Sequence, residues 1–166
     1  FVLNTRVKPH EYMIDWTPSE QIHGIAPLDV VDCAPLDIVL LELLDRVKFD
    51  QTDKFYIYNK EFDIRLIEQS LSNERLDAFG LYDYEFSPNS ELEAFCQLLT
   101  ARSTCLMLEY SAFAAVPTSK GGYKWHKLTS ACDQIGFDYS ALSAHAAASD
   151  CLLAAAVYRH LHGDFK

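Results

Sequence analysis

The feature that most constrains the fold is a short apolar run, Phe55–Tyr58, that leads directly into a helical pattern. A continuous run of aromatic and β-branched side chains is typical of a buried strand, and Asn59 suits the turn that ends it. Apolar residues then recur at helical spacing, at Phe62, Leu66, Ile67 and Leu71. A strand, a tight turn and a helix in succession predict an α/β domain.

The rest of the chain also alternates between strand-like and helical patterns. Apolar residues at helical spacing behind Pro35 predict a helix over residues 34–49. A final helix over Ala146–His162 is expected to stop at Gly163, which suits the left-handed position after a helix. The remaining predictions are a strand over Phe1–Val7, a loop over residues 77–90, helices over 91–100 and 105–115, a loop over Pro117–Gly122 and a helix over Trp125–Ile135.

Length and composition indicate a single soluble domain. With 166 residues, 49% of them hydrophobic, the chain is long enough for one core and short for two ordinary domains. Charges interrupt every apolar stretch before it reaches the length of a membrane span, and the first residues lack the layout of a secretion signal. Because the chain begins at Phe1 and its only methionines are Met13 and Met107, we expect further residues upstream.

The five cysteines are odd in number, lie far apart and form no C-x-x-C pair. This pattern favours buried free thiols in a reducing compartment over zinc ligands or disulfides. We therefore expect a cytoplasmic protein.

The formal charge of −10 argues against a protein that holds nucleic acid by bulk electrostatics, because phosphate contacts normally need a basic face. It leaves room for a protein that meets phosphates through divalent cations. Acidic clusters that hold Mg²⁺ or Mn²⁺ become locally positive only when the metal is bound.

Three residues have the chemistry of a catalytic or metal-binding site. Asp150 lies in line with the apolar stripe of the last predicted helix, formed by Leu153, Val157 and Leu161. A carboxylate on that side is costly unless it binds a metal, is hydrogen-bonded or lies at an edge that reaches water. Asp63 follows the buried strand, where α/β sheets place ligands, although the helix dipole alone favours an acid there. His145 has small neighbours and suits a general base, or an ordinary surface position.

Four segments, in order, resemble the DEDDh exonucleases, the family that includes ribonuclease T and the proofreading subunit of the bacterial replicative polymerase. Ile22–Ile25 resembles the HGI turn, Asn59–Asp63 resembles the N-x-x-F-D motif, and His145–Asp150 resembles the H-x-x-x-x-D motif. Tyr123–Leu128 is similar to the segment that precedes this last motif. The resemblance implies a ribonuclease-H-like mixed sheet flanked by helices.

The resemblance also implies a site and a reaction. Asp63 and Asp150 would be two of four acids that serve two divalent metals, Mg²⁺ or Mn²⁺, and His145 would be the general base. Asn59 and Phe62 would shape the site around the 3′-terminal nucleotide. The reaction would be hydrolysis of terminal phosphodiesters at single-stranded 3′ ends of DNA or RNA. The ring faces of Tyr58, Phe62 and Trp125 suit base stacking, although core packing is the commoner role of each.

One departure from the family is large. The first motif, D-x-E, supplies two acids on an opening strand, and this sequence does not contain it in that context. We expect it upstream of Phe1, with the first strands of the sheet, and we expect the chain without it to be nearly inactive. The alternative is a catalytically inactive member of the fold that serves as a binding or scaffold subunit. A polymerase partner and a homodimer are both compatible with the sequence.

Overall fold

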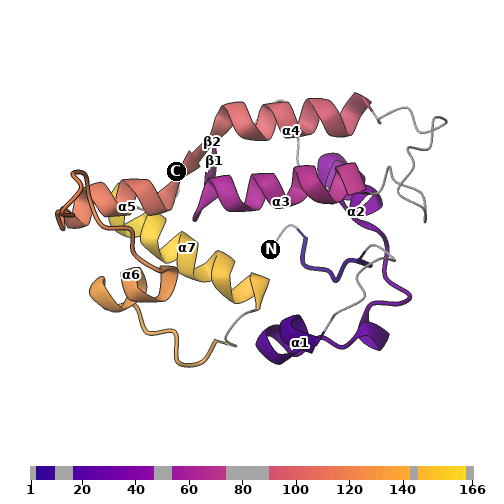
Figure 1. The fold of residues 1–166 in the computed structure, drawn as a ribbon, viewed down its shortest axis with the longest axis horizontal. Helices are drawn as coiled ribbons and strands as arrows, with labels where there is room; N and C mark the ends of the chain where they lie inside the picture. The colour runs from indigo at the N-terminus through magenta and orange to yellow at the C-terminus, as the bar shows by residue number, and fades with distance from the viewer. Residues whose placement is uncertain (1–2, 10–16, 47–53, 74–89, 143–145, 164–166) are drawn as a thin grey trace. The chain divides into compact units, whose positions relative to one another are not determined.

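The computed structural model describes residues 3–9, 17–46, 54–73, 90–142 and 146–163. The chain divides into two compact units, which are treated separately below. Unit 1 comprises Phe1–Asp53 and Ile64–Arg102, and unit 2 comprises Lys54–Asp63 and Ser103–Lys166. The described elements mix helices with a small sheet, which makes this an α/β chain (Figure 1).

The described part of unit 1 is helical. It contains α1 (Thr17–His23), a 3₁₀ turn η1 (Pro27–Asp29), α2 (Leu36–Arg46), most of α3 (Lys60–Asn73) and α4 (Ser90–Arg102). Helices α2 and α4 pack on one another. Their inward faces are apolar, which is the arrangement expected of amphipathic helices. The buried apolar residues of these helices and of α3 are Val39, Leu40, Ile64, Leu92, Phe95 and Leu99.

Unit 2 is built on a parallel pair of short strands. β1 (Phe55–Ile57) pairs with β2 (Ser103–Cys105), with Phe55 opposite Ser103 and Ile57 opposite Cys105. Each strand leads into a helix, β1 into the start of α3 and β2 into α5 (Leu106–Ala114). The remaining elements are α6 (Leu128–Gln134) and α7 (Ala147–His162), and α7 packs against both α5 and α6.

The core of unit 2 lies where α5, α6 and α7 meet. Its buried members are Tyr110, Ala131, Cys132, Leu153 and Val157. The side chain of Tyr58, which directly follows β1, packs against this core and is partly buried. Strand β1 is thereby attached to the three helices, and the turn after it is held close to them.

Most of the predicted helices are confirmed. The helices expected over 34–49, 91–100 and 105–115 correspond to α2, α4 and α5, and the final helix starts at Ala147 and stops before Gly163, whose φ is +83°. The helix expected from Trp125 begins three residues later, at Leu128. The sequence patterns missed α1, η1 and β2. The loop expected over 77–90 lies outside the described residues except for Ser90, which begins α4.

The strand predicted over Phe1–Val7 is wrong for the residues that the structure describes. Residues 3–7 have no regular structure, and the nearest pairing is an isolated parallel bridge between Lys8 and Pro35. A β-rich sequence becomes a strand only when a neighbouring strand satisfies its backbone groups, and residues 3–7 pair with none of the described residues. Within the described ranges, none of the helices is both long and apolar enough to span a bilayer.

Candidate functional site

Asp63 is positioned by the tight turn between β1 and α3. Asn59 adopts a left-handed φ of +61°, which asparagine tolerates better than most residues, and its carbonyl oxygen accepts the N–H of Phe62 at 2.9 Å. The chain thus turns from strand to helix within two residues. Asp63 lies in the first turn of α3, where the helix dipole favours an acid, and its side chain is half-buried.

Asp150 lies in the first turn of α7. Its N–H donates to the carbonyl of Ala146 at 3.0 Å, which closes the first turn of the helix. The buried apolar residues of the stripe follow one and two turns later, at Leu153 and Val157. The sequence pattern suggested that Asp150 points toward the core side, but its side chain is exposed. The carboxylate therefore occupies the edge position that was the alternative interpretation, although the neighbouring Ser149 is buried.

The two carboxylates lie within electrostatic range of one another in unit 2. Burial raises the pKa of Asp63 above its usual value, and the charge of Asp150 raises it further. The pKa of the Cys151 thiol is raised by burial, then by Asp150 and then by Asp63. The pKa values of two separate groups, Asp63 and Cys151, are therefore both raised by charges of this carboxylate pair. The fold brings together residues that are 87 positions apart in the sequence, at the start of α3 and the start of α7.

A half-buried carboxylate beside a second one of like charge is unfavourable without a compensating cation. Carboxylate oxygens are hard ligands of the kind that Mg²⁺ and Mn²⁺ prefer, so the donor atoms of the pair fit such an ion. Two carboxylates supply only part of a coordination sphere. Among the described residues, no group of three or more His, Cys, Asp and Glu side chains is arranged to hold a metal ion.

The other predicted site residues differ in position. His145 lies outside the described residues. Asn59 forms the turn ahead of Asp63, and the Phe62 ring is 46% exposed on the first turn of α3. Of the three aromatic residues considered for base stacking, Tyr58 packs on the core, whereas Trp125 is 66% exposed and does not belong to it.

The segment corresponding to the HGI turn ends α1 in unit 1. Gly24 has a φ of +68°, and its N–H donates to the carbonyl of Glu20 at 2.7 Å. The N–H of Ile25 donates to Nδ1 of His23 at 3.0 Å. The segment therefore stops a helix and redirects the chain, which is a structural role that glycine makes possible.

A polar network that the sequence did not predict anchors the segment before α6. The hydroxyl of Tyr58 donates to the carbonyl of His126 at 2.8 Å, and Nε2 of Gln134 lies 3.2 Å from Nδ1 of His126. The hydroxyl of Tyr110 donates to Oε1 of Gln134 at 2.9 Å. His126 is buried, and no described group forms a hydrogen bond with its Nε2. The network attaches this segment to the residue that follows β1, which no sequence spacing reveals.

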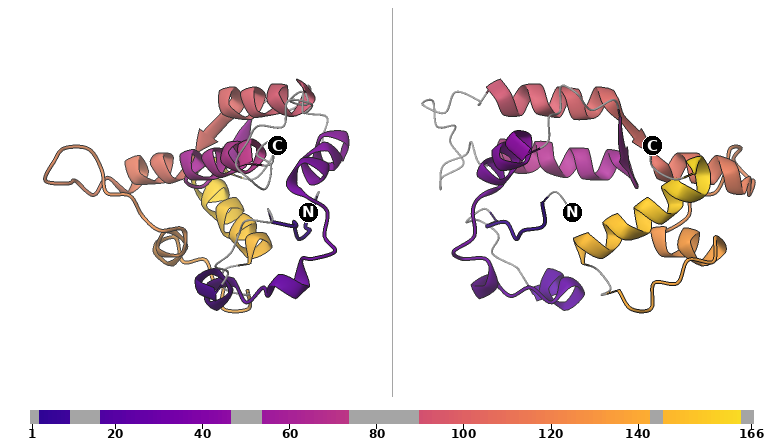
Figure 2. Two further views of the ribbon diagram at one scale, coloured as in Figure 1. Left: turned by 45° about the vertical axis from the view of Figure 1, so that its right-hand side comes forward. Right: turned by 180° about the vertical axis from the view of Figure 1, so that it is seen from behind.

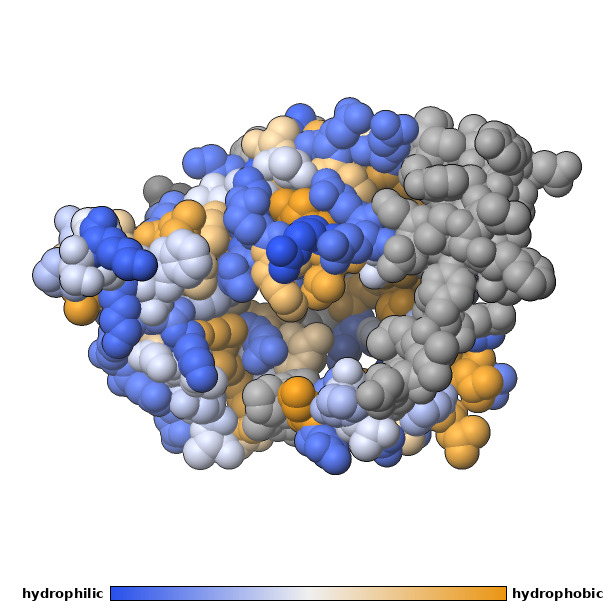
Figure 3. Space-filling view, in the orientation of Figure 1, coloured by the Kyte–Doolittle hydropathy of each residue, from blue (hydrophilic) through white to orange (hydrophobic). Residues whose placement is uncertain are grey.

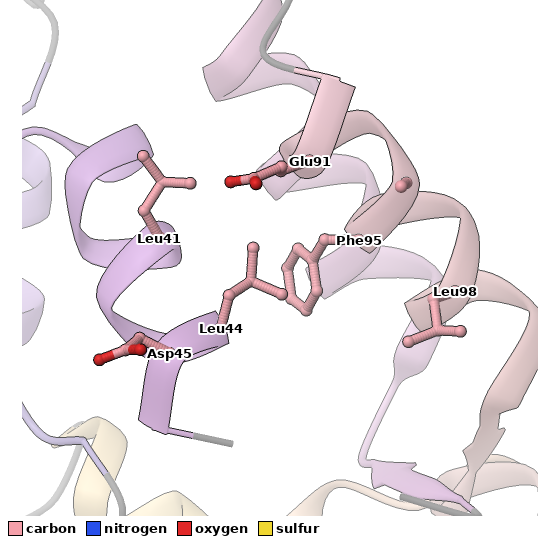
Figure 4. A pocket seen from close by; sticks show the side chains of 7 residues that line it. Leu41, Leu44, Asp45, Glu91, Phe95 and Leu98 are labelled. Atoms are coloured by element: carbon pink, nitrogen blue, oxygen red, sulfur yellow. The ribbon is translucent and has the colours of Figure 1, made fainter. Parts of the chain in front are cut away.

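Unit 1 contains a separate apolar pocket of about 700 Å³ between α2 and α4 (Figure 4). Leu44 and Phe95 point toward one another across it, and the carboxylates of Asp45 and Glu91 lie at its margin. None of the predicted site residues lines it. The candidate site is therefore the carboxylate pair of unit 2 and not this pocket.

Comparison with known proteins shows a relative in a bacteriophage. The chain is 34% identical to the "uncharacterized exonuclease CP81" of Escherichia phage 186 over 152 residues, which cover 90% of this chain and 67% of the phage protein. No family model and no solved structure matches the chain significantly. This identity over two thirds of the phage protein shows common descent, and the chain belongs to the exonuclease family of which the phage 186 protein is a member.

Proposed function

We propose that the protein is a metal-dependent 3′-to-5′ exonuclease that hydrolyses terminal phosphodiesters of single-stranded DNA or RNA. The observation that carries the proposal is the pair of a half-buried Asp63 and an exposed Asp150, in a chain of an exonuclease family: burial raises the pKa of Asp63, and the charge of Asp150 raises it further. The exonuclease family supplies the reaction class. The carboxylate pair, together with the DEDDh-like motifs, supports the metal dependence, the 3′ polarity and a ribonuclease-H-like fold.

Each residue has a role in this proposal. Asp63 and Asp150 would hold the cations through carboxylate oxygens, and the turn at Asn59 fixes where Asp63 lies. His145, five residues before Asp150, would take the proton of the attacking water. The exposed ring of Phe62 would pack against the terminal nucleotide. Two bound divalent ions would orient the water and stabilise the charge on the leaving 3′ oxygen.

The proposal predicts hydrolysis that requires metal and begins at the 3′ end. The complete protein should release labelled nucleotide from a 3′-labelled oligonucleotide in Mg²⁺ or Mn²⁺, shorten a 5′-labelled one stepwise and stop in EDTA. Asp63→Asn should abolish this activity, because an amide holds a divalent cation poorly. Asp32→Asn, at an exposed position of unit 1, is the matched control and should leave the rate unchanged.

Other outcomes would exclude parts of the proposal. Cleavage of a circular single strand, or undiminished cleavage in EDTA, would rule out a metal-dependent exonuclease. Activity of Asp63→Asn equal to that of Asp32→Asn would remove Asp63 from the site. A complete protein that binds oligonucleotides but never cleaves them would be the inactive scaffold instead.

A further inference from the structure

The segment Val116–Lys127 has a composition unlike the rest of the chain. It contains three lysines, Lys120, Lys124 and Lys127, together with Tyr123 and Trp125, and no acidic residue occurs between Glu109 and Asp133. The chain as a whole has 14 Lys and Arg against 24 Asp and Glu. A local excess of positive charge in an acidic protein marks a surface that would attract an anion which the rest of the molecule repels.

This segment forms a well-defined hairpin. An antiparallel bridge joins Pro117 to Tyr123, the N–H of Lys124 donates to the carbonyl of Val116 at 2.8 Å, and the N–H of Thr118 donates to the carbonyl of Gly122 at 3.1 Å. Gly121 and Gly122 form the turn with φ values of +84° and +76°, which favour glycine. Figure 2 shows the backbone of this segment projecting beyond the end of α5, and residues 115–125 are all exposed.

The hairpin exposes both its bases and its rings. Tyr123 is 50% exposed and Trp125 is 66% exposed, and all three lysine side chains are exposed. None of the three ammonium groups forms an ion pair with a described carboxylate. Figure 3 shows this end of unit 2 as a largely pale surface with separate strongly hydrophilic groups, not as a continuous apolar patch. Such a surface suits a ligand that combines negative charge with flat apolar faces.

The base of the hairpin is fixed to the strand that leads to Asp63. His126 is buried between the exposed Trp125 and Lys127, and its carbonyl accepts the hydroxyl of Tyr58 at 2.8 Å. Tyr58 directly precedes the turn at Asn59 from which α3 and Asp63 follow. The hairpin is therefore held in a defined position relative to the carboxylate pair, as a surface that guides a strand toward a site must be.

We propose that the Val116–Lys127 hairpin binds single-stranded nucleic acid. The lysines contact phosphates, and Tyr123 and Trp125 stack on bases of the strand whose 3′ end is hydrolysed. Alternating basic and aromatic side chains suit this ligand, because a single strand presents phosphates and base faces in turn. The three exposed lysines favour this ligand over a protein partner docked by apolar contacts alone, because such a partner would leave their charges unmatched. The inference rests on the proposed exonuclease function for the identity of the strand.

Binding measured without hydrolysis tests this surface apart from the reaction. The complete protein is titrated in EDTA into fluorescein-labelled oligothymidylate and oligouridylate of about 20 nucleotides, longer than the usual single-strand footprint. Trp125→Ala should weaken binding at least about fivefold, and Trp125→Phe should retain most of it, because one stacked base contributes about 1–3 kcal/mol. Joint replacement of the three lysines by Ala should lower the salt slope of log K by about 2.

Charge reversal provides a matched control. Lys124→Glu should weaken binding, whereas Lys54→Glu, at an exposed position outside the hairpin, should not. Circular dichroism should show the same fold in every variant, because the replaced side chains are exposed. Hairpin variants that bind both oligonucleotides as tightly as the unmodified protein would overturn the inference, and the hairpin would then serve another partner, such as an acidic protein.

Asp63→Asn separates the inference from the proposed function. If this variant binds normally but does not cleave, and the hairpin variants fail to bind, both the inference and the function are supported. If the unmodified protein binds through the hairpin but cleaves nothing, the hairpin assignment holds and the nuclease function fails. If the unmodified protein cleaves and the hairpin variants bind as tightly as it does, the nuclease function holds and the hairpin assignment fails.

Discussion

Asp63 is the residue at which the proposed function and the stability of the fold conflict most directly. Its carboxylate is half-buried, and the charge of Asp150 lies close enough to raise its pKa. In a folded protein without metal, the charged form of Asp63 is therefore less favourable than in the unfolded chain. The fold keeps this unfavourable pair, as functional sites commonly do when a ligand restores the balance.

We therefore expect Asp63→Asn to stabilise the metal-free protein. At pH 7 the unfolded chain ionises Asp63 freely, whereas the folded chain must hold the same charge beside Asp150, so removing the charge should raise the free energy of unfolding. The gain should shrink as the pH falls toward the folded pKa, because Asp63 is then protonated and neutral in both variants. Urea unfolding in EDTA measures it, with Asp32→Asn as control. A less stable Asp63→Asn variant at pH 7 would contradict the repulsion.

Cys132 gives a prediction at alkaline pH. The residue is fully buried, its thiol contacts the carbonyl of Leu153 at 3.7 Å, and burial, with a smaller effect of Asp133, raises its pKa to about 11. Between about pH 9 and 11 the unfolded chain loses this proton and the folded chain keeps it, so stability should fall as pH rises. In Cys132→Ala the fall should be shallower, by at most about 1.4 kcal/mol per pH unit. Thermal unfolding across this range measures the slope, and equal slopes in both proteins would exclude the effect.

Candidate site residues could be predicted from the sequence where a residue with suitable chemistry lies next to a recognisable strand or helix. Asp63 and Asp150 could be selected because each lies beside a recognisable element, and the structure brings the two together. The exposure of Asp150 could not be foreseen, because helical spacing says nothing of where the core ends along a helix. The hydrogen bond from the Tyr58 hydroxyl to the His126 carbonyl could not be predicted from the sequence either, because the two residues are 68 positions apart.

At the scale of elements, α7 shows how one helix contributes both to the core and to the candidate site. Its first turn carries Asp150, and its middle buries Leu153 and Val157 against α5 and α6. Adjacent residues on the helix therefore differ sharply: Leu153 is 3% exposed, whereas Leu152 is 41% exposed. The packing of Leu153 fixes the rotation of the helix and thereby the direction in which Asp150 points.

Leu153→Ala should accordingly lower the free energy of unfolding by about 2–5 kcal/mol, because it leaves a cavity in the core. Leu152→Ala, one position earlier, should change it by about 0.5 kcal/mol or less. Chemical denaturation of both variants measures the two free energies of unfolding, provided that both show the same dependence of free energy on denaturant concentration. Equal losses for the two would mean that α7 is rotated relative to the packing described here.

Helices were easier to predict than strands for a physical reason. The helices α2, α4 and α7 carry their signal in their own residues, as apolar side chains at helical spacing and as a glycine after the last turn of α7. The strand β2 has only three residues, too few to show a period, and it exists through its pairing with β1. Residues 3–7 show the opposite case. Their sequence is β-rich, but they form no strand, and the nearest pairing is the isolated bridge at Lys8.

At the scale of the whole molecule, the described carboxylate pair supplies only part of a metal site. Residues 1–166 produced alone are expected to bind Mn²⁺ weakly and to hydrolyse little, because a hard cation needs about six oxygen ligands and no group of three or more acidic, His or Cys side chains among the described residues could hold one. Calorimetric titration with Mn²⁺ and a 3′-labelled oligonucleotide assay would compare these residues with the complete protein. Strong binding and robust hydrolysis by residues 1–166 would show that the missing ligands come from within them.

In the complete protein, His145→Ala should behave differently from Asp63→Asn. It should slow hydrolysis by about 100- to 10,000-fold while Mn²⁺ binding persists, because a general base moves a proton and is not a metal ligand. Loss of Mn²⁺ binding in this variant would instead make His145 a ligand. The two variants together separate proton transfer from metal coordination.

The exposure of Trp125 has an optical consequence. The chain has two tryptophans, and an indole that is 66% exposed emits at the long wavelengths typical of contact with water. In Trp16→Phe, all tryptophan emission would come from Trp125, near the base of the hairpin. Contact of the indole with any aromatic ligand would quench that emission directly. The protein therefore carries an intrinsic fluorophore at this surface, and stopped-flow mixing could follow events there in real time without an added dye.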